Sequence, residues 1–446
     1  MTKKIRDFLF PLFIVIFVIM TIITSLYASG YKLNLTWPLS FNRLLLKTGM
    51  LAVATEPTKA IIYLNNKPQN DLSINPWKKD YIVTPAKIKS LLPGEYELRL
   101  ETEGYWPYKQ KINIYSGETT FVEDVNLFKN NSPLLILNLE ETGLSMSTDS
   151  KYIYASSAKK IITLKNDNVR NLNLDINQID NGGHWLKNNK LFESGIIFDP
   201  SKENADTNYA SIIGSGATNW FFEENSGELY YQNNNSINRL DINKKTSAAI
   251  ISGANYLDYE VRVNNLFTIT NTDNQTKLNS YSLNNSKLNG EWTLPNSGHY
   301  KFDDQDLKYL TIYDDQNKTL YLFDENNLIN GPMIIRNINN WSLFNNQALI
   351  YTNDFEIYIF NFSNSRSDLI TRRSEKIKEI IWNTTGNYLI FSEEKNLNVL
   401  DFKNRNTTTL VSADKISSPV LDIKNNNLYF WAKIGDKNGI YKMLMQ

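Results

Sequence analysis

The sequence predicts an all-β chain behind one N-terminal transmembrane helix: first a small β-sandwich, then a β-propeller of about eight blades. Three observations indicate this order. An uncharged apolar run spans residues 8–31, strands of alternating polarity occupy residues 49–128, and short apolar strands then recur about every 40 residues. The predicted segments are 1–30 (cytoplasmic stub and helix), 31–48 (juxtamembrane linker), 49–128 (sandwich) and 133–446 (propeller).

The N-terminal apolar run is long enough to cross a bilayer, because about 20 apolar residues span a hydrocarbon core of about 30 Å. Lys3, Lys4 and Arg6 precede it, and the positive-inside rule keeps such charges in the cytoplasm and exports the rest of the chain. The alternative is a secreted protein whose signal peptide is cleaved near residues 28–30. The run exceeds the ~7–15 apolar residues of a signal core, which favours a retained anchor. The expected anchoring aromatics are Phe8, Phe13, Phe17 and Tyr27.

Composition excludes several classes of function. The 446 residues contain 47 basic and 47 acidic side chains, so no net charge attracts the chain to nucleic acid. There is no cysteine, which excludes disulfides, zinc–thiolate sites and cysteine nucleophiles.

The segment 49–128 carries a set of turn and strand residues with local physical roles. Pro93 and Gly94 predict a tight turn that needs a positive φ at Gly94, and the following strand alternates apolar residues. Gly104 is expected to end that strand and let Tyr105 fold back onto the sheet. The complete set is Pro57, Ala60, Tyr63, Leu64, Asn65, Thr84, Pro85, Pro93, Gly94, Tyr96, Gly104 and Tyr105.

Together these residues resemble a PEGA domain, a small extracytoplasmic β module of bacterial and archaeal surface proteins. The motif that names the family reads Pro57-Thr58-Lys59-Ala60 here, and residues 68–80 form an insertion before Thr84 and Pro85. Neither departure removes a strand. The resemblance therefore implies a bacterial surface protein that works outside the membrane.

The remainder of the chain is a repeat of short apolar strands, each preceded by a polar turn, as expected for four-stranded propeller blades. The repeat resembles WD40-like or TolB-like propellers. Eight blades fit the spacing; seven is the alternative, because the unit at residues 185–209 is irregular. The strands are 152–154, 191–192, 229–231, 266–269, 309–312, 349–351, 388–391 and 428–431.

The last unit stops after its third strand, at residues 440–444. The apolar strand 134–139 precedes the first blade, and we expect it to supply the missing outer strand and close the ring. Many units carry a tryptophan in or beside the innermost strand, and packing between blades is its expected role. These tryptophans are Trp185, Trp220, Trp341 and Trp382.

The sequence assigns no catalytic residue, cofactor or metal ligand. His184 and His299 stand alone without a nucleophile elbow. Residues 214–216 lack the lysine and helix of a phosphate-binding loop. A group of acidic residues could supply the oxygen ligands that calcium binds, but these residues lack the spacing of a dedicated calcium-binding loop. The preferred interpretation is that they lie in solvated turns. Its members are Asp303, Asp304, Asp306, Asp314, Asp315, Asp324 and Glu325.

Two classes of function follow. The first is a membrane-anchored binding or scaffolding protein of the cell envelope, with a protein or glycan partner. The alternative is a carboxylate-based envelope hydrolase, for example one that acts on glycans. A propeller funnel that contains two buried or closely apposed carboxylates would favour the hydrolase, whereas a funnel lined by Asn, Ser and aromatic residues would favour binding.

Overall fold

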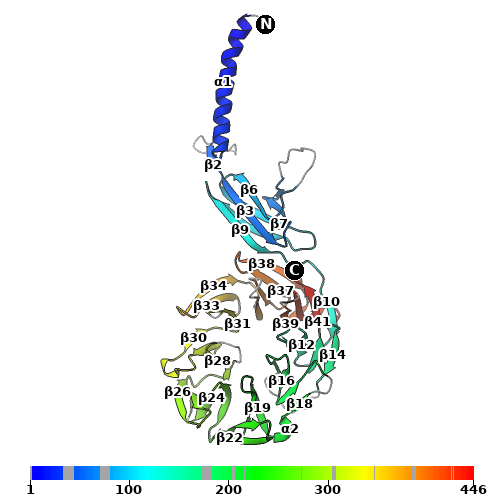
Figure 1. Cartoon of the computed structure of the whole chain (residues 1–446), viewed down its shortest axis with the longest axis vertical. Helices are drawn as coiled ribbons and strands as arrows, with labels where there is room; N and C mark the ends of the chain where they lie inside the picture. The colour runs from blue at the N-terminus through cyan, green and yellow to red at the C-terminus, as the bar shows by residue number, and fades with distance from the viewer. Residues whose placement is uncertain are drawn as a thin grey trace. The chain divides into compact units, whose positions relative to one another are not determined.

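The computed structural model describes residues 3–33, 45–70, 81–172, 183–202, 206–214, 216–272, 274–303, 308–345, 347–383, 388–422, 424 and 426–446. The chain divides into two compact units. The first contains Met1–Asn131 with Asp401–Thr408 and Gln446, and the second contains Ser132–Leu400 with Thr409–Met445. The predicted fold class is confirmed: one N-terminal helix is followed by β-sheets (Figure 1).

The N-terminal helix α1 runs from Lys3 to Ala28, and Pro11 lies within its first turns. Its segment Leu9–Ala28 is long and apolar enough to cross a membrane, criteria that a signal sequence also meets. Phe13, Phe17 and Tyr27 are exposed along it, as an anchor requires, whereas the side chain of Phe8 lies outside the described part. After the helix, β1 (Tyr31–Leu33) pairs with β2 (Leu45–Lys47).

Two facing sheets form the small sandwich. One has the order β6-β3-β9, in which β3 and β9 run parallel, and the other has the order β5-β4-β7-β8. Their buried residues make one core, which includes Leu51, Ile62 and Leu98. The strands are β3 (Gly49–Glu56), β4 (Ile61–Leu64), β5 (Lys67–Pro68), β6 (Ala86–Leu91), β7 (Gly94–Glu101), β8 (Tyr108–Ile114) and β9 (Thr119–Asn126).

The residues that carry the family resemblance form turns and local contacts within the sandwich. Thr84 is 1% exposed, and its hydroxyl lies 2.5 Å from that of Thr55 and accepts a bond from the Ala60 amide at 3.0 Å. Gly104 has a φ of +78°, and Tyr105 after it packs partly buried against the core. Peptide bonds before Pro57 and Pro85 are cis, and Pro93 precedes β7.

Gly94 has the positive φ that the turn prediction requires, at +150°. We expect Gly94→Val to lower the free energy of unfolding of the sandwich by about 1–3 kcal/mol, because this backbone region is essentially restricted to glycine. No atom lies within 4 Å of the added Cβ, so the cost comes from the backbone alone. Separate melting transitions of the two units measure it, and Glu95→Val, one residue further along the strand, is the control. An equal loss in both units contradicts this assignment.

Eight four-stranded sheets succeed one another within the described residues 134–444, and we number them as blades 1 to 8. Blade 1 is β11 (Leu144–Met146), β12 (Tyr152–Ala155), β13 (Lys160–Thr163) and β14 (Asn168–Asn171). Blade 2 is β15 (His184–Trp185), β16 (Leu191–Glu193), β17 (Ile196–Phe198) and β18 (Thr207–Asn208), followed by α2 (Ala210–Ile213). Blade 3 is β19 (Ala217–Glu223), β20 (Glu228–Asn233), β21 (Ser236–Asp241) and β22 (Thr246–Ser252). Blade 4 is β23 (Tyr256–Arg262), β24 (Asn265–Thr272), β25 (Gln275–Ser282) and β26 (Leu288–Leu294).

The second half continues the pattern. Blade 5 is β27 (Tyr300–Phe302), β28 (Leu310–Asp314), β29 (Thr319–Phe323) and β30 (Met333–Arg336), with the 3-10 helix η2 (Leu328–Asn330) before β30. Blade 6 is β31 (Asn340–Asn345), β32 (Ala348–Thr352), β33 (Glu356–Asn361) and β34 (Arg366–Arg372). Blade 7 is β35 (Glu379–Asn383), β36 (Tyr388–Ser392), β37 (Asn396–Asp401) and β38 (Asn406–Ser412). Blade 8 is β39 (Lys415–Asp422), β40 (Asn427–Ile434), β41 (Lys437–Leu444) and β10 (Leu134–Asn138). In Figure 1 the sheets follow one another around a ring.

The apolar strands that recur in the sequence are mostly the second strands of the blades. All five residues of β32 and of β36 are buried, because a neighbouring blade covers each face of such a strand. Neighbouring blades also meet through their first strands, for example β35 with β39 and β39 with β11. Tryptophans on first strands pack across such junctions, as expected: Trp185 on Tyr152, Trp341 on Tyr313 and Trp382 on Phe344. Trp220 packs on Tyr231 of its own blade and also lies against Gly195 of blade 2.

The N-terminal strand β10 pairs antiparallel with β41, the third strand of blade 8, so one sheet contains both ends of the propeller segment. Leu135 lies opposite Tyr441, and Asn138 opposite Gly439. The indole of Trp431 adds a hydrogen bond of 2.9 Å to the carbonyl of Leu139. This is the pairing that the strand at 134–139 was expected to make.

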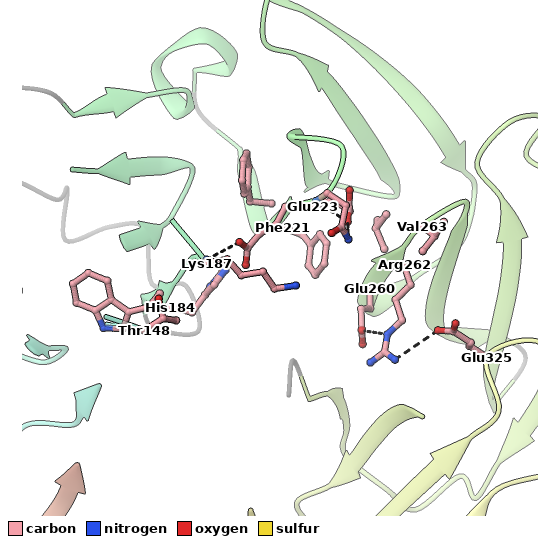
Figure 2. Close-up of a pocket in the computed structure, with 14 residues that line it drawn as sticks. Thr148, His184, Lys187, Phe221, Glu223, Glu260, Arg262, Val263 and Glu325 are labelled. Atoms are coloured by element: carbon pink, nitrogen blue, oxygen red, sulfur yellow. Dashed lines mark hydrogen bonds and ion pairs between the residues drawn. The ribbon is translucent and has the colours of Figure 1, made fainter. Parts of the chain in front are cut away.

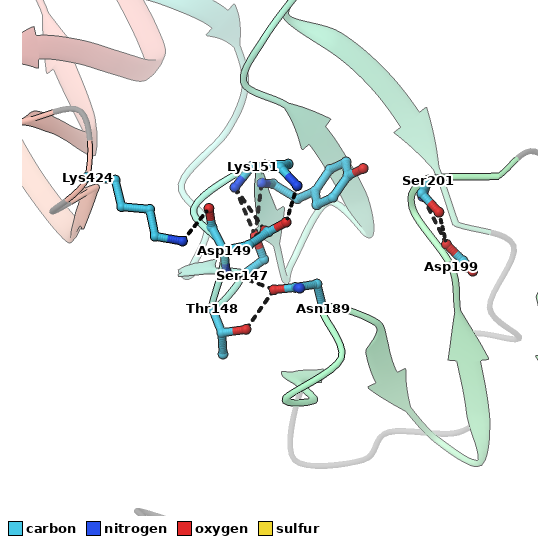
Figure 3. Close-up of polar contacts among 9 residues, drawn as sticks. Ser147, Thr148, Asp149, Lys151, Asn189, Asp199, Ser201 and Lys424 are labelled. Carbon is cyan, nitrogen blue, oxygen red and sulfur yellow. Dashed lines mark hydrogen bonds and ion pairs between the residues drawn. The ribbon is translucent and has the colours of Figure 1, made fainter.

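Polar contacts also join the turns that follow the first strands of blades 8, 1 and 2 (Figure 3). The Asn189 carboxamide oxygen accepts from the Thr148 hydroxyl at 2.6 Å and from the Asp149 amide at 2.8 Å. On the other side, Lys424 donates to the carbonyl of Asp149 at 3.4 Å. The blade 1 turn is ordered internally by Ser147, whose hydroxyl donates to the Asp149 carboxylate at 2.8 Å. Figure 3 also shows the equivalent local bond of Ser201 to Asp199.

Candidate functional site

A cavity of 420 Å³ opens where the first strands of blades 1 to 4 end; we call it the mouth cavity (Figure 2). This volume lies within the range of small-ligand sites. The ends of β15, β19 and β23 and the turns after them build most of its wall, and blade 5 contributes Glu325. Its lining residues are Thr148, His184, Trp185, Lys187, Phe221, Phe222, Glu223, Glu224, Asn225, Glu260, Val261, Arg262, Val263 and Glu325.

Two of its carboxylates are held by turns of blades 2 and 3. Glu223, 5% exposed, accepts from the backbone amide of Ser226 at 2.6 Å and from the Asn225 carboxamide at 2.8 Å. Burial alone would raise the pKa of Glu223, but the bonds from Ser226 and Asn225 outweigh it and lower this pKa. Glu224 accepts from the backbone amide of Lys187 at 2.7 Å and so joins two blades.

Arg262 is the cationic centre of the cavity. Its guanidinium forms an ion pair with buried Glu260 on the same strand and lies 3.7 Å from the carboxylate of Glu325 in blade 5. It also donates to the carbonyl of Tyr309 at 3.1 Å. Figure 2 shows the guanidinium between the two carboxylates. Because charge-assisted bonds of this type are strong and directional, Arg262 fixes the junction of blades 4 and 5.

Val263 stands beside Arg262 at the rim, in the turn between β23 and β24. Its φ is +51°, a left-handed conformation that is rare for a β-branched residue, and its side chain is 70% exposed. Strain of about 1–3 kcal/mol persists only where the surroundings enforce it, and such residues cluster at binding sites. The turn therefore presents an apolar side chain to solvent beside the cavity.

Aromatic side chains line the rest of the wall. Phe222 packs on Phe192 of blade 2 and Phe221 on Tyr259 of blade 4, with ring centroids 5.8 and 6.4 Å apart. The rings of His184 and Phe192 pack edge to face, with their centroids 5.3 Å apart. These residues give the cavity a mixed aromatic and charged surface, suited to contacts with a partner that has both apolar and polar groups.

The residues considered in the sequence do not come together at one site. His184 lines the mouth cavity, whereas exposed His299 contacts Asp315 at 2.7 Å in blade 5. Asp314 is buried and accepts from the amides of His299, Gln316 and Asn317. The other acidic residues have separate partners. Asp303 accepts a hydrogen bond from the Trp341 indole, Asp324 accepts one from the Asn326 backbone amide, and the Glu325 carboxylate lies 3.7 Å from the Arg262 guanidinium. Asp304 and Asp306 lie outside the described residues. Within the described residues, no group of three or more potential ligands is placed to hold a metal ion.

Sequence reasoning missed Glu223, Glu260 and Arg262, the residues that shape the mouth cavity. One signal for them was present. All three lie at or near the end of the innermost strand of a blade, directly before its first turn. In a propeller such positions from successive blades converge at one end of the central channel. In the segment 214–216, Ser215 lies outside the described residues. Gly214 and Gly216 do not line the mouth cavity.

Fold and site together define a chain that carries a small β-sandwich and a β-propeller with a charged, aromatic mouth. Residues 73–129 match the PEGA domain family, which confirms the resemblance stated above. The limits 49–128 of the module remain a prediction, because the match starts later. No curated protein sequence matches the chain.

Several solved structures are similar to this chain over about 70% of its length. Oligogalacturonate lyase from Vibrio parahaemolyticus is 10% identical with a TM-score of 0.39, covering 70% of this chain and 90% of that chain. Streptogramin B lyase is 12% identical with a TM-score of 0.38, covering 71% and 98%. A chain of the mitotic checkpoint complex is 11% identical with a TM-score of 0.38, covering 71% and 93%. At these identities the likenesses say nothing about activity.

Proposed function

We propose that this chain is a membrane-anchored, extracytoplasmic binding or scaffolding protein of the cell envelope, and that its propeller presents the mouth cavity to a partner. One observation carries the proposal: the charged groups Glu223, Glu224 and Arg262 are each held by internal hydrogen bonds or ion pairs. A rim ordered in this way loses little conformational entropy when a partner binds. It is suited to recognition.

The charges of the cavity favour a basic protein segment as the partner. Four glutamates face one lysine and one arginine among the lining residues, which leaves two formal negative charges with histidine neutral. Half-buried Phe221 and Phe222 and exposed Val263 supply apolar contact area. A partner that combines Lys or Arg with an apolar side chain is complementary to both features.

Photo-crosslinking in the native cell tests the proposal. A photoreactive residue in place of Val263 is expected to yield one discrete crosslinked product, and the yield should fall at high salt because screening weakens the attraction. The same residue in place of Leu288, 45% exposed on the outer strand β26, is the control. Identical product patterns at the two positions, or none at position 263, argue against the mouth cavity as the docking site.

The proposed location has its own test. Since Lys3, Lys4 and Arg6 precede the apolar helix, we expect protease added to intact spheroplasts to digest both folded units while α1 stays in the membrane fraction. Protection of both units would contradict the orientation. Release of an intact soluble form that begins near Tyr31 would instead identify a cleaved signal peptide and a secreted protein.

The carboxylate hydrolase is the second candidate, because two buried carboxylates, Glu223 and Glu260, line the same cavity. Glycoside hydrolysis needs one protonated acid beside one free carboxylate. Glu223, with its lowered pKa, is unsuited to the acid role, and Glu260 is engaged by Arg262. Turnover of an envelope glycan that is lost in both Glu223→Gln and Glu260→Gln would reverse this order of preference.

A further inference from the structure

A second cavity, of 550 Å³, lies near the start of the first strand of blade 6, whereas the mouth cavity is built where first strands end. Blades 5 and 6 form its wall: Lys318 lies between β28 and β29, Asn337 and Asn339 lie between β30 and β31, and the turn 353–356 lies between β32 and β33 beside the end of β34. Phe355 in this turn is 47% exposed, and we call the space the Phe355 cavity. Its volume lies within the range of small-ligand sites.

Hydrogen bonds hold the turn that carries Phe355. The Asn353 carboxamide oxygen accepts from the backbone amide of Phe355 at 2.9 Å. The carbonyl of Phe355 accepts from the amide of Arg373 at 2.8 Å, and the carbonyl of Asp354 accepts from the amide of Ile377 at 2.8 Å. Phe355 therefore stands on a fixed backbone, so a ligand that contacts its ring orders little of the protein.

The charges around the Phe355 cavity leave one cation in excess, the ammonium group of Lys318. Lys318 is exposed and has no ion-pair partner among the described residues, and its Nζ lies 5.9 Å from the ring centroid of Tyr313. The pKa of Asp354 is lowered chiefly by Lys376 and further by Lys318, so the Lys318 charge reaches the cavity wall. An anionic ligand therefore gains the attraction of Lys318 without breaking an existing pair. The other charges form three ion pairs: Arg372 with Glu356, Lys376 with Asp354, and Arg373 with Glu393.

Two side-chain amides give the cavity wall the capacity to bind hydroxyl groups. Asn337 is exposed, and its carboxamide makes no hydrogen bond to another described residue. Asn339 donates to the Asp354 carboxylate at 2.8 Å through its amino group, which leaves its carbonyl oxygen for a ligand. A carboxamide has both donors and acceptors, as a hydroxyl group has, so the two groups are complementary.

We propose that the Phe355 cavity binds an acidic sugar, with the apolar face of the sugar ring on Phe355, its hydroxyl groups at Asn337 and Asn339, and its carboxylate at Lys318. The face of an aromatic ring carries partial negative charge and attracts the C–H groups of a sugar ring. An acidic peptide would also satisfy Lys318, but it lacks the hydroxyl-bearing ring that fits Phe355 and the two amides together. The site is separate from the mouth cavity, and the proposal does not depend on the partner that binds there.

Saturation-transfer NMR tests the proposal on the full-length protein, in a detergent without a sugar headgroup. The probe is methyl β-D-glucuronide, and methyl β-D-glucoside is its neutral counterpart. The glucuronide should bind about threefold more tightly, as expected from one exposed cation, and high salt should reduce this advantage. Lys318→Met should abolish the advantage and leave the glucoside unaffected. Lys395→Met is the matched control, because Lys395 is exposed in the equivalent turn of blade 7, between β36 and β37, and does not line the cavity.

Phe355→Leu is the second variant. It keeps an apolar side chain but removes the ring, so both sugars should bind about threefold more weakly. Phe121→Leu, at a position 65% exposed on β9 of the sandwich, should bind both sugars like the wild type. Equal affinity for the two sugars, or unchanged binding of both in Lys318→Met or Phe355→Leu, would overturn the proposal. Absence of saturable sugar binding would also overturn it, as would tighter binding of a triglutamate peptide than of the glucuronide, which would assign the cavity to acidic peptides.

Discussion

Replacing Gly439 with valine is expected to lower the free energy of unfolding of the propeller by about 3 kcal/mol, the upper range for overpacking. Gly439 lies on β41 opposite Asn138 of β10. A Cβ at this position would stand 2.1 Å from the carbonyl oxygen of Leu137 and 3.0 Å from the Cα of Asn138. Both are backbone atoms, so relief requires β10 to separate from β41. The variant therefore opens the seam between the first and last blades.

Chemical denaturation of the full chain measures the effect, and Gly290→Val is the matched control. Gly290 also lies in a strand, but the nearest atoms to its added Cβ are side-chain atoms of Leu328 at 3.7–3.8 Å, an ordinary contact. We expect its stability to change by no more than about 0.5 kcal/mol. A chain that begins at Thr142 lacks β10 and should aggregate or melt below one that begins at Asn131, because two sheet edges become exposed. Wild-type stability of Gly439→Val would show that the ring does not depend on this strand pair.

Replacing Arg373 with alanine is expected to cost about 3 kcal/mol, because it leaves a buried charge without its partner. Glu393, 1% exposed after β36, accepts from the Arg373 guanidinium at 2.9 Å and from the Asn398 carboxamide at 3.0 Å. Arg373 follows the last strand of blade 6, so this ion pair joins blades 6 and 7. The guanidinium also covers the ring of Phe391 at 5.5 Å.

The neighbouring arginine is the control for this second experiment. Arg372 also pairs with a glutamate, Glu356, but its side chain is 71% exposed, and exposed pairs contribute at most about 1 kcal/mol. Adding Glu393→Gln to Arg373→Ala should recover part of the loss, since the amide carries no charge. Similar losses in Arg372→Ala and Arg373→Ala, or no recovery in the double variant, would contradict a buried ion pair between these blades.

Much of the fold was predictable because its strongest signals are local or periodic. The second strand of each blade is covered on both faces, so stretches such as β32 and β36 read as short apolar runs between polar turns, at a regular spacing. The positive φ of Gly94 follows from the chemistry of its turn. The alternative number of seven blades arose from the irregular blade 2, because its strands have only two or three residues each and give a weak sequence signal.

The sequence by itself determined the order of the parts: an apolar N-terminal helix, a PEGA domain and a repeat of four-stranded sheets. The tertiary structure decided which side chains share a site. Glu260, Arg262 and Glu325 meet at one cavity because the ring juxtaposes blades 4 and 5. Glu379 and Ser145 lie more than two hundred residues apart in the chain, yet they line one cavity because blades 7, 8 and 1 follow one another around the ring. The repeated pattern of apolar residues in the sequence indicates which strands are buried. Contacts between blades depend on the geometry of the whole ring, which the sequence of a single repeat does not encode.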